Sequence, residues 1–421
     1  MSKIKFGTDG WRAIIAEDFT VANVARVAEG TALWLLKQKS NTGIILGHDC
    51  RFAGALFCNT IAKVMSAKGV HVTMSKGFVS TPMVSLGTVK ERKDLGIIIT
   101  ASHNPPEYNG FKLKGSFGGP LLPKHVAEIE DLIPDHCSVD YASLDFEKFV
   151  ADGMIQHIDL ERMYCDHVAA NFDMELIKNS GLQLAYDAMY GAGQNVIKRM
   201  LPAITKLHCD YNPSFMGQAP EPIHKNLTEF SELIKNAKNI DSGLVTDGDA
   251  DRIGLYDNEG NFVDSHHIIL LLIHYLVKYK KMNGKVCTAF STTPRVAKLC
   301  RHYSLPLETV KIGFKYISEK MVTEDVLVGG EESGGIAVKG HIPERDGIWD
   351  GLVLLEFMAK TGKTMKQIIQ EVYDVVGAFY FDRLDLHLEE SLKQQIIKNC
   401  LEKKYKSFGK FTPTRFEDID G

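Results

Sequence analysis

Three aspartates in one short segment carry the strongest chemical signal in the sequence. Asp247, Asp249 and Asp251 alternate with other residues in a run that ends at Arg252. Carboxylates held ~4 Å apart repel one another by about 4 kcal/mol per pair at an effective dielectric constant of about 20. A hard divalent cation removes that repulsion, so the run predicts a site for Mg²⁺ or a similar ion; a solvated acidic turn is the alternative. The run is not an EF-hand, because Arg252 and Asn258 stand where that loop needs Gly and Glu.

A serine in a stiff loop is the candidate nucleophile or phosphate carrier. Ser102 follows the apolar run Leu95–Thr100 and comes shortly before two prolines. Proline fixes φ, so the loop is rigid, and a rigid loop that displays a hydroxyl suits covalent catalysis. An ordinary turn rich in Asn and Pro is the alternative, and composition alone favours it. His103 adjoins Ser102, although neighbouring side chains can point apart.

Two basic side chains are candidates for binding the same phosphoryl group. Lys112 follows Ser102 by ten residues, so its ammonium reaches the same pocket if the chain folds back as a hairpin. Arg12 stands beside two glycines in the run Phe6–Arg12, and a guanidinium can bind phosphate through two parallel hydrogen bonds. A solvated lysine and a surface arginine after a hairpin turn are the alternatives.

The glycine-rich run Gly329–Gly335 is a candidate sugar-binding loop. Its glycines allow close approach, and Glu331 and Ser333 offer acceptors for sugar hydroxyls. It is not a nucleophile elbow, because Glu331 stands where that motif needs glycine. Walker A and dinucleotide-binding motifs are absent as well, since Phe357 and Val196 occupy the positions of required glycines.

The elements that must position these loops follow a repeated alternation of strand and helix. The predicted strands are 44–47, 70–74, 95–100, 182–187, 242–246, 285–290 and 325–328. The predicted helices are 53–68, 194–200, 264–280 and 294–301. This alternation predicts an α/β fold of βαβ units with largely parallel sheets. Ligands bind outside the carboxyl ends of strands in such sheets, so we expect the chemistry in the loops at 100–110, 247–252 and 329–335.

The length and the alternation together predict several domains. Boundaries near residues 150, 258 and 371 divide the 421 residues into segments 1–150, 151–258, 259–371 and 372–421. The last segment differs from the others, with a strand expected at 379–386, a helix at 389–404 and the beginning of a strand from residue 415.

The composition is that of a soluble globular protein, with 44% apolar residues, 24% charged residues and a net charge of −4. A nearly balanced charge predicts no nucleic-acid partner and no membrane partner. Eight cysteines without a CxxC pair indicate reduced thiols, and Met1–Lys5 leads into no apolar signal core, so we expect a cytoplasmic location. The most apolar run, Ile268–Val277, is too short to span a bilayer.

Taken together, the motifs resemble the α-D-phosphohexomutase superfamily, which includes phosphoglucomutase and phosphomannomutase. The matching runs are Thr100–Pro105, Asp187–Gly193, Asp247–Arg252 and Gly330–Gly335. The resemblance extends from Phe6 to about Arg383. It implies three similar mixed α/β domains around a central cleft, carrying the phosphoserine (1–150), the metal (151–258) and the sugar loops (259–371). It also implies a fourth, phosphate-binding domain at 372–421.

The resemblance also implies roles for individual residues. Ser102 would be phosphorylated in the resting enzyme and would bind Mg²⁺ together with Asp247, Asp249 and Asp251. The implied substrate-binding residues are Arg252, Gly313, Phe314, Lys315, Glu331, Ser333 and Arg345. The implied catalytic residues are Ser102, His103, Lys112 and Arg12. Of these, Lys112 is the candidate general acid or base, with His103 or Arg12 assisting.

The implied reaction interconverts glucose 1-phosphate and glucose 6-phosphate through glucose 1,6-bisphosphate, which is both intermediate and activator. Gly335, in a position that holds histidine in several phosphomannomutases and phosphoglucosamine mutases, favours glucose. Arg345 stands where the glucose enzymes commonly carry lysine, so a phosphate contact is expected there. Phosphomannomutase and phosphoglucosamine mutase remain the nearest alternatives. A metal-dependent phosphatase that only hydrolyses phosphoserine is an alternative from a different enzyme class.

The fourth domain is expected to be incomplete in this chain. The family's Arg-Ser/Gly-Thr-rich loop, which holds the non-reacting phosphate, has no counterpart between Arg415 and Gly421. A further alternative is therefore a sugar-phosphate-binding protein with little turnover. The oligomeric state is left open.

Overall fold

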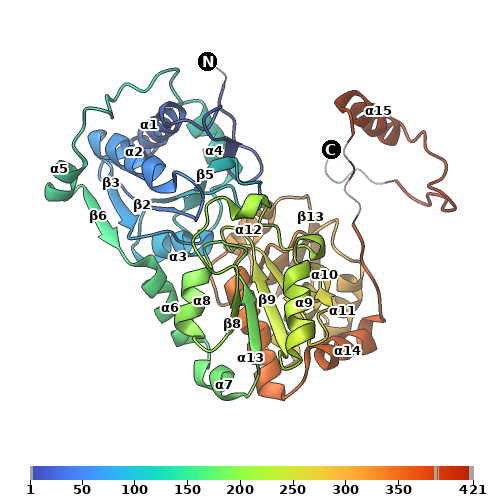
Figure 1. Ribbon diagram of the computed structural model, residues 1–421. Helices are drawn as coiled ribbons and strands as arrows, with labels where there is room; N and C mark the ends of the chain where they lie inside the picture. The colour runs from blue at the N-terminus through green and yellow to red at the C-terminus, as the bar shows by residue number, and fades with distance from the viewer. Residues whose placement is uncertain (1–2, 384–385, 387, 417–421) are drawn as a thin grey trace.

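The computed structural model describes residues 3–383, 386 and 388–416. These residues form three α/β domains, each built on its own sheet, followed by a tail that carries one helix (Figure 1). All three sheets contain both parallel and antiparallel strand pairs. The prediction of three mixed α/β domains is therefore confirmed.

The first domain has a six-stranded sheet in the order β1-β5-β4-β2-β3-β6. Its strands are β1 (Trp11–Ile14), β2 (Gly43–His48), β3 (His71–Ser75), β4 (Leu95–Ile99), β5 (Tyr108–Gly115) and β6 (Ile155–Ile158). Its helices are α1 (Val21–Gln38), α2 (Gly54–Ala67), α3 (Thr81–Lys90), α4 (Pro123–Glu130) and α5 (Phe146–Ala151). Strand β5 runs antiparallel to β4, with Lys112 opposite Ile98, so the chain folds back after Ser102 as a hairpin.

The second domain has a five-stranded sheet in the order β11-β10-β9-β7-β8. Its strands are β7 (Leu184–Asp187), β8 (Thr205–Leu207), β9 (Ser242–Thr246), β10 (Ile253–Tyr256) and β11 (Phe262–Val263). Its helices are α6 (Leu160–Asn171), α7 (Met174–Asn179), α8 (Gln194–Met200) and α9 (Thr228–Ala237), with 3₁₀ turns η1 (Phe215–Gly217) and η2 (His224–Asn226). The three aspartates form the tight connection between β9 and its antiparallel neighbour β10.

The third domain has a four-stranded sheet in the order β13-β12-β14-β15. Its strands are β12 (Lys285–Ala289), β13 (Leu307–Val310), β14 (Val326–Gly330) and β15 (Ile336–Val338). Its helices are α10 (Ser265–Lys278), α11 (Arg295–Tyr303), α12 (Phe314–Thr323), α13 (Gly347–Thr361) and α14 (Met365–Val376). The predicted sugar loop connects β14 to β15.

Buried side chains of the three domains pack against one another, and this packing fixes the positions of their loops relative to one another. Helix α13 packs against β9 and β10 of the second sheet as well as β15 of the third, and α3 packs against α6. One continuous apolar cluster includes Met83 of the first domain, Leu255 of the second and Leu352 of the third. Helix α13 begins where the carboxylate of Asp346 accepts the N–H groups of Ile348 and Trp349, a side-chain cap that fixes the entry to the helix.

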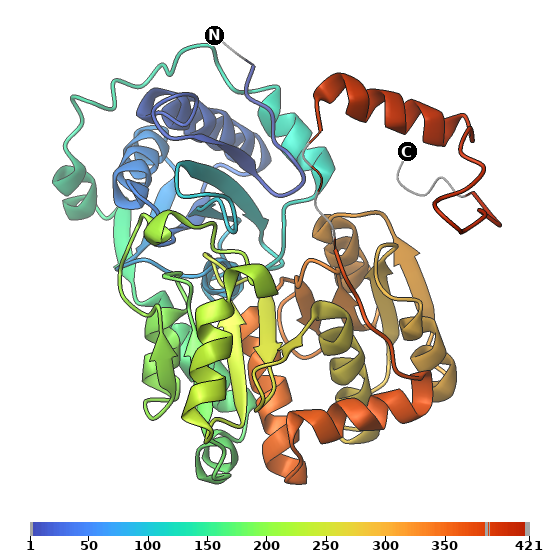
Figure 2. The same ribbon diagram turned by 45° about the vertical axis from the view of Figure 1, so that its right-hand side comes forward.

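The tail differs from the expected partial domain. The strand predicted at 379–386 is wrong for the described residues 379–383 and 386, which have no regular structure. The predicted helix is present as α15 (Glu390–Leu401), none of whose side chains is buried, and it lies apart from the third domain (Figure 2). The strand expected from Arg415 lies mostly outside the described residues. The two described residues of that stretch, Arg415 and Phe416, have no regular structure.

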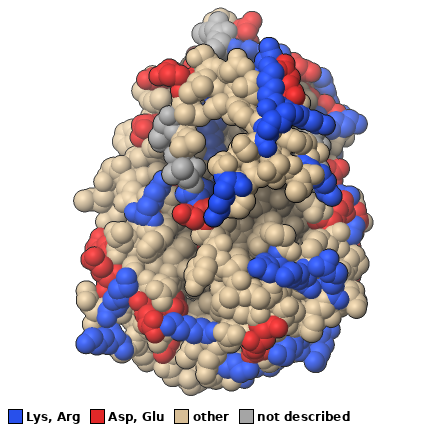
Figure 3. Space-filling view, turned by 90° about the vertical axis from the view of Figure 1, so that its right-hand side faces the viewer, with Lys and Arg blue, Asp and Glu red and all other residues tan. Residues whose placement is uncertain are grey.

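The first sheet continues past the expected boundary at residue 150, because β6 pairs with β3. The boundaries near 150, 258 and 371 remain predictions. No helix within the described ranges is both long and apolar enough to cross a membrane. On the face shown in Figure 3, basic and acidic side chains are interspersed, which agrees with the balanced composition.

Candidate active site

Ser102 lies in the turn between β4 and β5 with its backbone in the left-handed region, at φ +53°. An L-residue there costs roughly 1–2 kcal/mol, so the surroundings must hold the conformation. The side chain is buried, and its Oγ donates a 2.6 Å hydrogen bond to Oδ2 of Asp247. The Nδ1 atom of His103 lies 3.4 Å from the same Oγ. The fold thus brings the serine of the first domain to the aspartates of the second.

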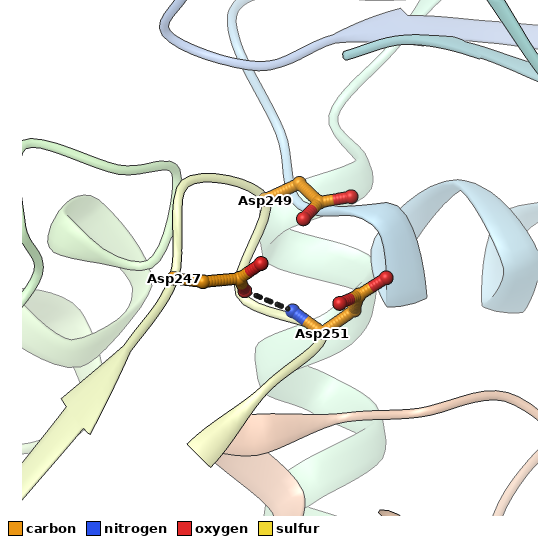
Figure 4. A group of neighbouring side chains, drawn as sticks. All are labelled: Asp247, Asp249 and Asp251. Carbon is orange, nitrogen blue, oxygen red and sulfur yellow. Dashed lines mark hydrogen bonds between the residues drawn. The ribbon is translucent and has the colours of Figure 1, made fainter. Parts of the chain in front are cut away.

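The three aspartates are fully buried, and their carboxylates project from one loop toward the same side (Figure 4). One oxygen from each lies within 4.8 Å of the others. Asp247 uses both oxygens, since Oδ1 accepts the N–H groups of Asp251 and Arg252 at 3.0 and 3.1 Å. The Oδ1 atoms of Asp249 and Asp251, in contrast, are buried without a hydrogen-bond partner. Two free buried carboxylate oxygens fit a hard divalent cation such as Mg²⁺.

The carboxylates are electrostatically unequal. Burial, together with the charges of Asp249 and Asp251, raises the pKa of Asp247 well above its ordinary value. Burial also opposes the charge of Asp249, but Lys112 outweighs it and lowers the pKa of that carboxyl. Asp247 is therefore the carboxyl whose charge is opposed by its neighbours, and a bound divalent cation would relieve that repulsion.

Lys112, on β5, is completely buried among carboxylates. Its Nζ lies 2.8 Å from Oδ2 of Asp249, 3.2 Å from Oδ2 of Asp251 and 2.9 Å from Oδ2 of Asp9. Burial opposes the charge, but Asp249 and Asp251 raise the pKa of Lys112 above its ordinary value. A lysine held in the charged form suits charge stabilisation better than proton abstraction.

Arg12 and His103 lie at the loop that carries Ser102. A guanidinium nitrogen of Arg12 donates a 2.6 Å hydrogen bond to Oδ1 of Asn104, and the group lies 3.8 Å from Asp9. Burial and the nearby charge of Arg252 lower the pKa of His103 far below its ordinary value, so the imidazole is neutral. The half-buried guanidinium of Arg12 is the more accessible cation near Ser102.

Arg345, expected to bind substrate, lies at the loop that carries the three aspartates. Its NH2 nitrogen is 2.5 Å from Oδ2 of Asp251 and 2.5 Å from Oδ2 of Asp9, and its side chain is 5% exposed. Its guanidinium stacks over the ring of Phe314 at 5.4 Å. A Cβ added to Gly335 would lie 2.4 Å from Cδ of Arg345, so the glycine leaves room for this arginine.

The remaining predicted sugar-binding residues lie at several separate places. Gly313 donates a 2.8 Å backbone hydrogen bond to Oε1 of Glu331, which ties the two loops of the third domain together. Ser333 lines a cavity of about 650 Å³ between the second and third domains and the start of the tail. Lys315 lines a separate cavity of about 200 Å³ beside the Gly7–Gly10 turn. Arg252 lies 3.9 Å from Glu221.

Three residues at the centre were missed by sequence reasoning. Thr81 donates a 2.5 Å hydrogen bond to Asp249. Asp9 pairs with Lys112 and Arg345, and, although burial opposes its charge, Lys112 lowers its pKa well below the ordinary value. Arg51 binds backbone carbonyls of the Ser102 loop. A signal for Arg51 existed, since it follows the carboxyl end of a predicted strand; Asp9 and Thr81 gave none.

Family models match most of the chain, one domain at a time. The descriptions "Phosphoglucomutase/phosphomannomutase, alpha/beta/alpha domain I", domain II and domain III match residues 3–138, 162–260 and 264–376. These three segments contain the serine, the aspartates and the sugar loops, respectively.

Individual relatives cover nearly the whole chain. A phosphoglucosamine/phosphogalactosamine mutase of Sulfurisphaera tokodaii is 28% identical over 94% of this chain and 86% of its own length. A phosphoglucomutase/phosphomannomutase of Thermococcus kodakarensis is 27% identical over 93% of this chain and 84% of its own. The crystal structure of a putative phosphomannomutase from Thermus thermophilus superposes with a TM-score of 0.85 at 32% identity, over 92% of this chain and 88% of that one. The chain therefore belongs to the phosphoglucomutase/phosphomannomutase family of the α-D-phosphohexomutase superfamily and is an enzyme of the mutase type.

Proposed function

We propose that the enzyme interconverts the 1- and 6-phosphates of a hexose or hexosamine through phosphorylated Ser102 and a hexose 1,6-bisphosphate. The single observation that carries this proposal is the hydrogen bond from Ser102 Oγ to Asp247, in a buried aspartate cluster with two unpartnered oxygens. A phosphate carrier beside a cation site is the arrangement that phosphoryl transfer needs.

The proposed cycle conserves the phosphoserine. The bond from phosphorus to Ser102 Oγ breaks as a bond forms to the free hydroxyl oxygen of the sugar monophosphate, which loses its proton while Oγ gains one. The bisphosphate then turns over in the site. Its other phosphoryl group returns to Ser102 by the reverse exchange, so the sugar leaves with its phosphate moved.

The surrounding residues are proposed to bind the metal, stabilise charge and exclude water. Asp247, Asp249 and Asp251 would hold Mg²⁺, which when bound neutralises charge on the phosphoryl oxygens. Lys112, bound among carboxylates, and Arg12, at the Ser102 loop, would stabilise negative charge during transfer. The burial of Ser102 supports the exclusion of water, which would otherwise hydrolyse the phosphoserine.

The sugar is proposed from two weaker observations. Relatives named for phosphoglucosamine favour a hexosamine phosphate over the glucose phosphate expected from the sequence. The adjacent carboxylates of Glu331 and Glu332 would also complement an ammonium at C2 of the sugar. We place glucosamine phosphate first, with glucose and mannose phosphates as the alternatives.

An isomerisation assay tests the function. The enzyme, Mg²⁺ and a trace of the matching bisphosphate are incubated with glucosamine 6-phosphate, glucose 1-phosphate or mannose 1-phosphate, and isomeric product and free phosphate are measured. We expect isomerisation without phosphate release, lost in Ser102→Ala and kept in Ser143→Ala, an exposed serine of the same domain. Phosphate release without isomerisation would instead establish a phosphatase, and full activity of Ser102→Ala would exclude the phosphoserine.

A further inference from the structure

The backbone of Ser102 is held at both of its polar groups by the side chains of other residues. Its N–H donates a 2.9 Å hydrogen bond to Oγ1 of Thr100, and its C=O accepts a 2.8 Å hydrogen bond from Arg51. With φ at +53°, the residue sits in a conformation that a serine does not favour by itself. These two contacts are therefore the local reason that the conformation persists.

Arg51 binds much more of the loop than Ser102 alone. One guanidinium nitrogen donates to the C=O of Ser102 and of Asn104, at 2.8 and 2.6 Å. The other terminal nitrogen donates to the C=O of Pro105 and of Tyr108, at 2.8 and 2.9 Å. The side chain is fully buried. A planar guanidinium that binds four carbonyls from one fixed position sets the curvature of the whole turn.

The same arginine is anchored on its other sides. Asp49 lies 3.5 Å from Nε of Arg51 and accepts its backbone N–H at 2.9 Å. Asp49 also accepts a 2.5 Å hydrogen bond from the hydroxyl of Thr100, whose oxygen receives the N–H of Ser102. The ring of Phe215, from the second domain, covers the guanidinium at 5.0 Å. Asp49, Arg51 and Thr100, which we call the brace, thus form one closed hydrogen-bonded circuit around Ser102.

A circuit of this kind matters because the side chain of Ser102 cannot position itself throughout the cycle. Its hydrogen bond to Asp247 requires a hydroxyl proton, which is absent whenever Oγ carries a phosphoryl group. The backbone contacts to Arg51 and Thr100 do not use Oγ, so phosphorylation does not remove their donors or acceptors. Constraints that act on the backbone can therefore keep Oγ in line for transfer in each direction.

We propose that the brace of Asp49, Arg51 and Thr100 positions Ser102 for phosphoryl transfer in both its free and its phosphorylated state. This inference rests on the proposed phosphoserine cycle. The side-chain hydrogen bonds and ion pair of the brace go to the loop of Ser102 and to one another, so we assign positioning roles to its residues and not catalytic ones. Their loss should lower kcat and expose the phosphoserine to water, while KM for the sugar phosphate changes little.

The first experiment compares Arg51→Lys with Arg26→Lys. Arg26 is a matched control, since it is also buried in the first domain and donates a 2.7 Å hydrogen bond to a loop carbonyl, that of Pro134. Lysine keeps the charge but cannot bind four carbonyls from one plane. We expect Arg51→Lys to lower kcat by about 100-fold, the size of a small misplacement of a reacting atom, with KM within about 3-fold. Phosphate release per isomerisation should rise, and Arg26→Lys should change neither quantity.

A second pair of variants applies if Arg51→Lys folds poorly. Thr100→Val removes the hydroxyl between Asp49 and the N–H of Ser102 with little change in volume, and Thr100→Ser restores it. We expect a reduced kcat and more phosphate release in the valine variant, with recovery in the serine variant. Thermal melting of each variant gives the folded fraction by which the rates are corrected.

The outcomes separate this inference from the proposed function. If Ser102→Ala is inactive while Arg51→Lys matches Arg26→Lys, or Thr100→Val matches Thr100→Ser, the brace has no positioning role. If Ser102→Ala keeps its activity, the phosphoserine cycle itself is wrong. A loss in kcat that disappears after correction for the folded fraction would reduce the brace to a purely structural role and overturn the inference.

Discussion

The centre formed by Ser102, Asp247 and Lys112 and the predicted sugar loops both follow strand ends. They differ in how many of their side chains are buried and hydrogen-bonded in the protein without substrate. Ser102, Asp247 and Lys112 are buried, and each is bound across a domain boundary or across the sheet. Lys315 and Ser333, by contrast, are partly exposed and line two separate cavities. The groups proposed for phosphoryl transfer are thus already bound to one another, while these two predicted sugar-binding side chains are more exposed.

The physical reason for the difference is charge. Groups that stabilise a moving phosphoryl must be fixed in advance, since reorganising dipoles during the reaction would raise the barrier. Sugar hydroxyls are neutral, and side chains that bind them can adapt at lower cost. Even so, the sugar loops contain two buried supports, Phe314 beneath Arg345 and Glu331 against Gly313.

The largest effect should come from removing one carboxylate of the centre. Asp249→Asn deletes one charged oxygen that is free for a metal, and loss of even an outer-shell partner costs about 10–100-fold in metal affinity or activity. We expect an activity loss beyond about 100-fold and a weakened Mg²⁺ response, measured by titrating Mg²⁺ after chelation. Asp152→Asn, an exposed aspartate of the first domain, is the control. An unchanged Mg²⁺ response in Asp249→Asn would remove this residue from the metal site.

The next test crowds the centre without changing its charge. A Cβ on Gly248 would lie 2.4 Å from the backbone oxygen of Ser102, so Gly248→Ala must push the two loops apart. We expect kcat to fall by about 100-fold, as for a misplaced reacting atom. Gly77→Ala is the control, because a Cβ there meets no atom within 4 Å. Equal activity of the two variants would show that the centre is less rigid than its packing indicates.

A smaller and different effect is expected in the sugar loops. Lys315→Ala removes a partly exposed cation at a cavity, and a hydrogen bond to a charged group contributes about 1.5–3 kcal/mol. We expect KM to rise about 10-fold with kcat nearly unchanged, because the interaction is made equally in ground and transition states. Steady-state kinetics with Lys360→Ala, an exposed lysine of α13, as control measures this. A fall in kcat with constant KM would move Lys315 into the chemical centre.

The smallest effect on activity is expected away from both regions. Glu29 lies beside Lys68 and Ser138, and although burial opposes its charge, these partners lower its pKa from 4.5 to about 2. A lowered folded-state pKa stabilises the protein above the unfolded value near 4.5, and this stability is lost as the pH falls toward 2. Denaturant unfolding should therefore show a Glu29→Gln variant destabilised at pH 7, with the difference from wild type shrinking as the pH falls from 4.5 toward 2. Its kcat at pH 7 should match that of wild type; a pH-independent difference in stability would contradict the ion-pair explanation.

Part of the active centre was readable because its signals are local. Three alternating aspartates predict a cation site from their spacing alone, and a serine in a stiff loop after a strand is recognisable without its neighbours. The strand and helix pattern likewise predicted the α/β domains, since periodicity records which faces are buried. The strand predicted at 379–386 was wrong over its described residues, because a strand forms only where another strand pairs with it, and the described residues give it none.

The sequence by itself predicted the kind of chemistry, with a candidate phosphate carrier, a candidate cation site and glycine loops at strand ends. Only the tertiary structure decided which charges meet. Arg345 and Asp9 lie 336 residues apart in the chain yet share a hydrogen bond beside the loop of the three aspartates. Arg51 lies 51 residues before Ser102, whose carbonyl it binds. Contacts of this range arise from packing within the first domain and between the domains, and no local pattern of residue types encodes them. For that reason the aspartates could be read from the chain, whereas the partners of Arg51 and Asp9 could not, although Arg51 follows the end of a predicted strand.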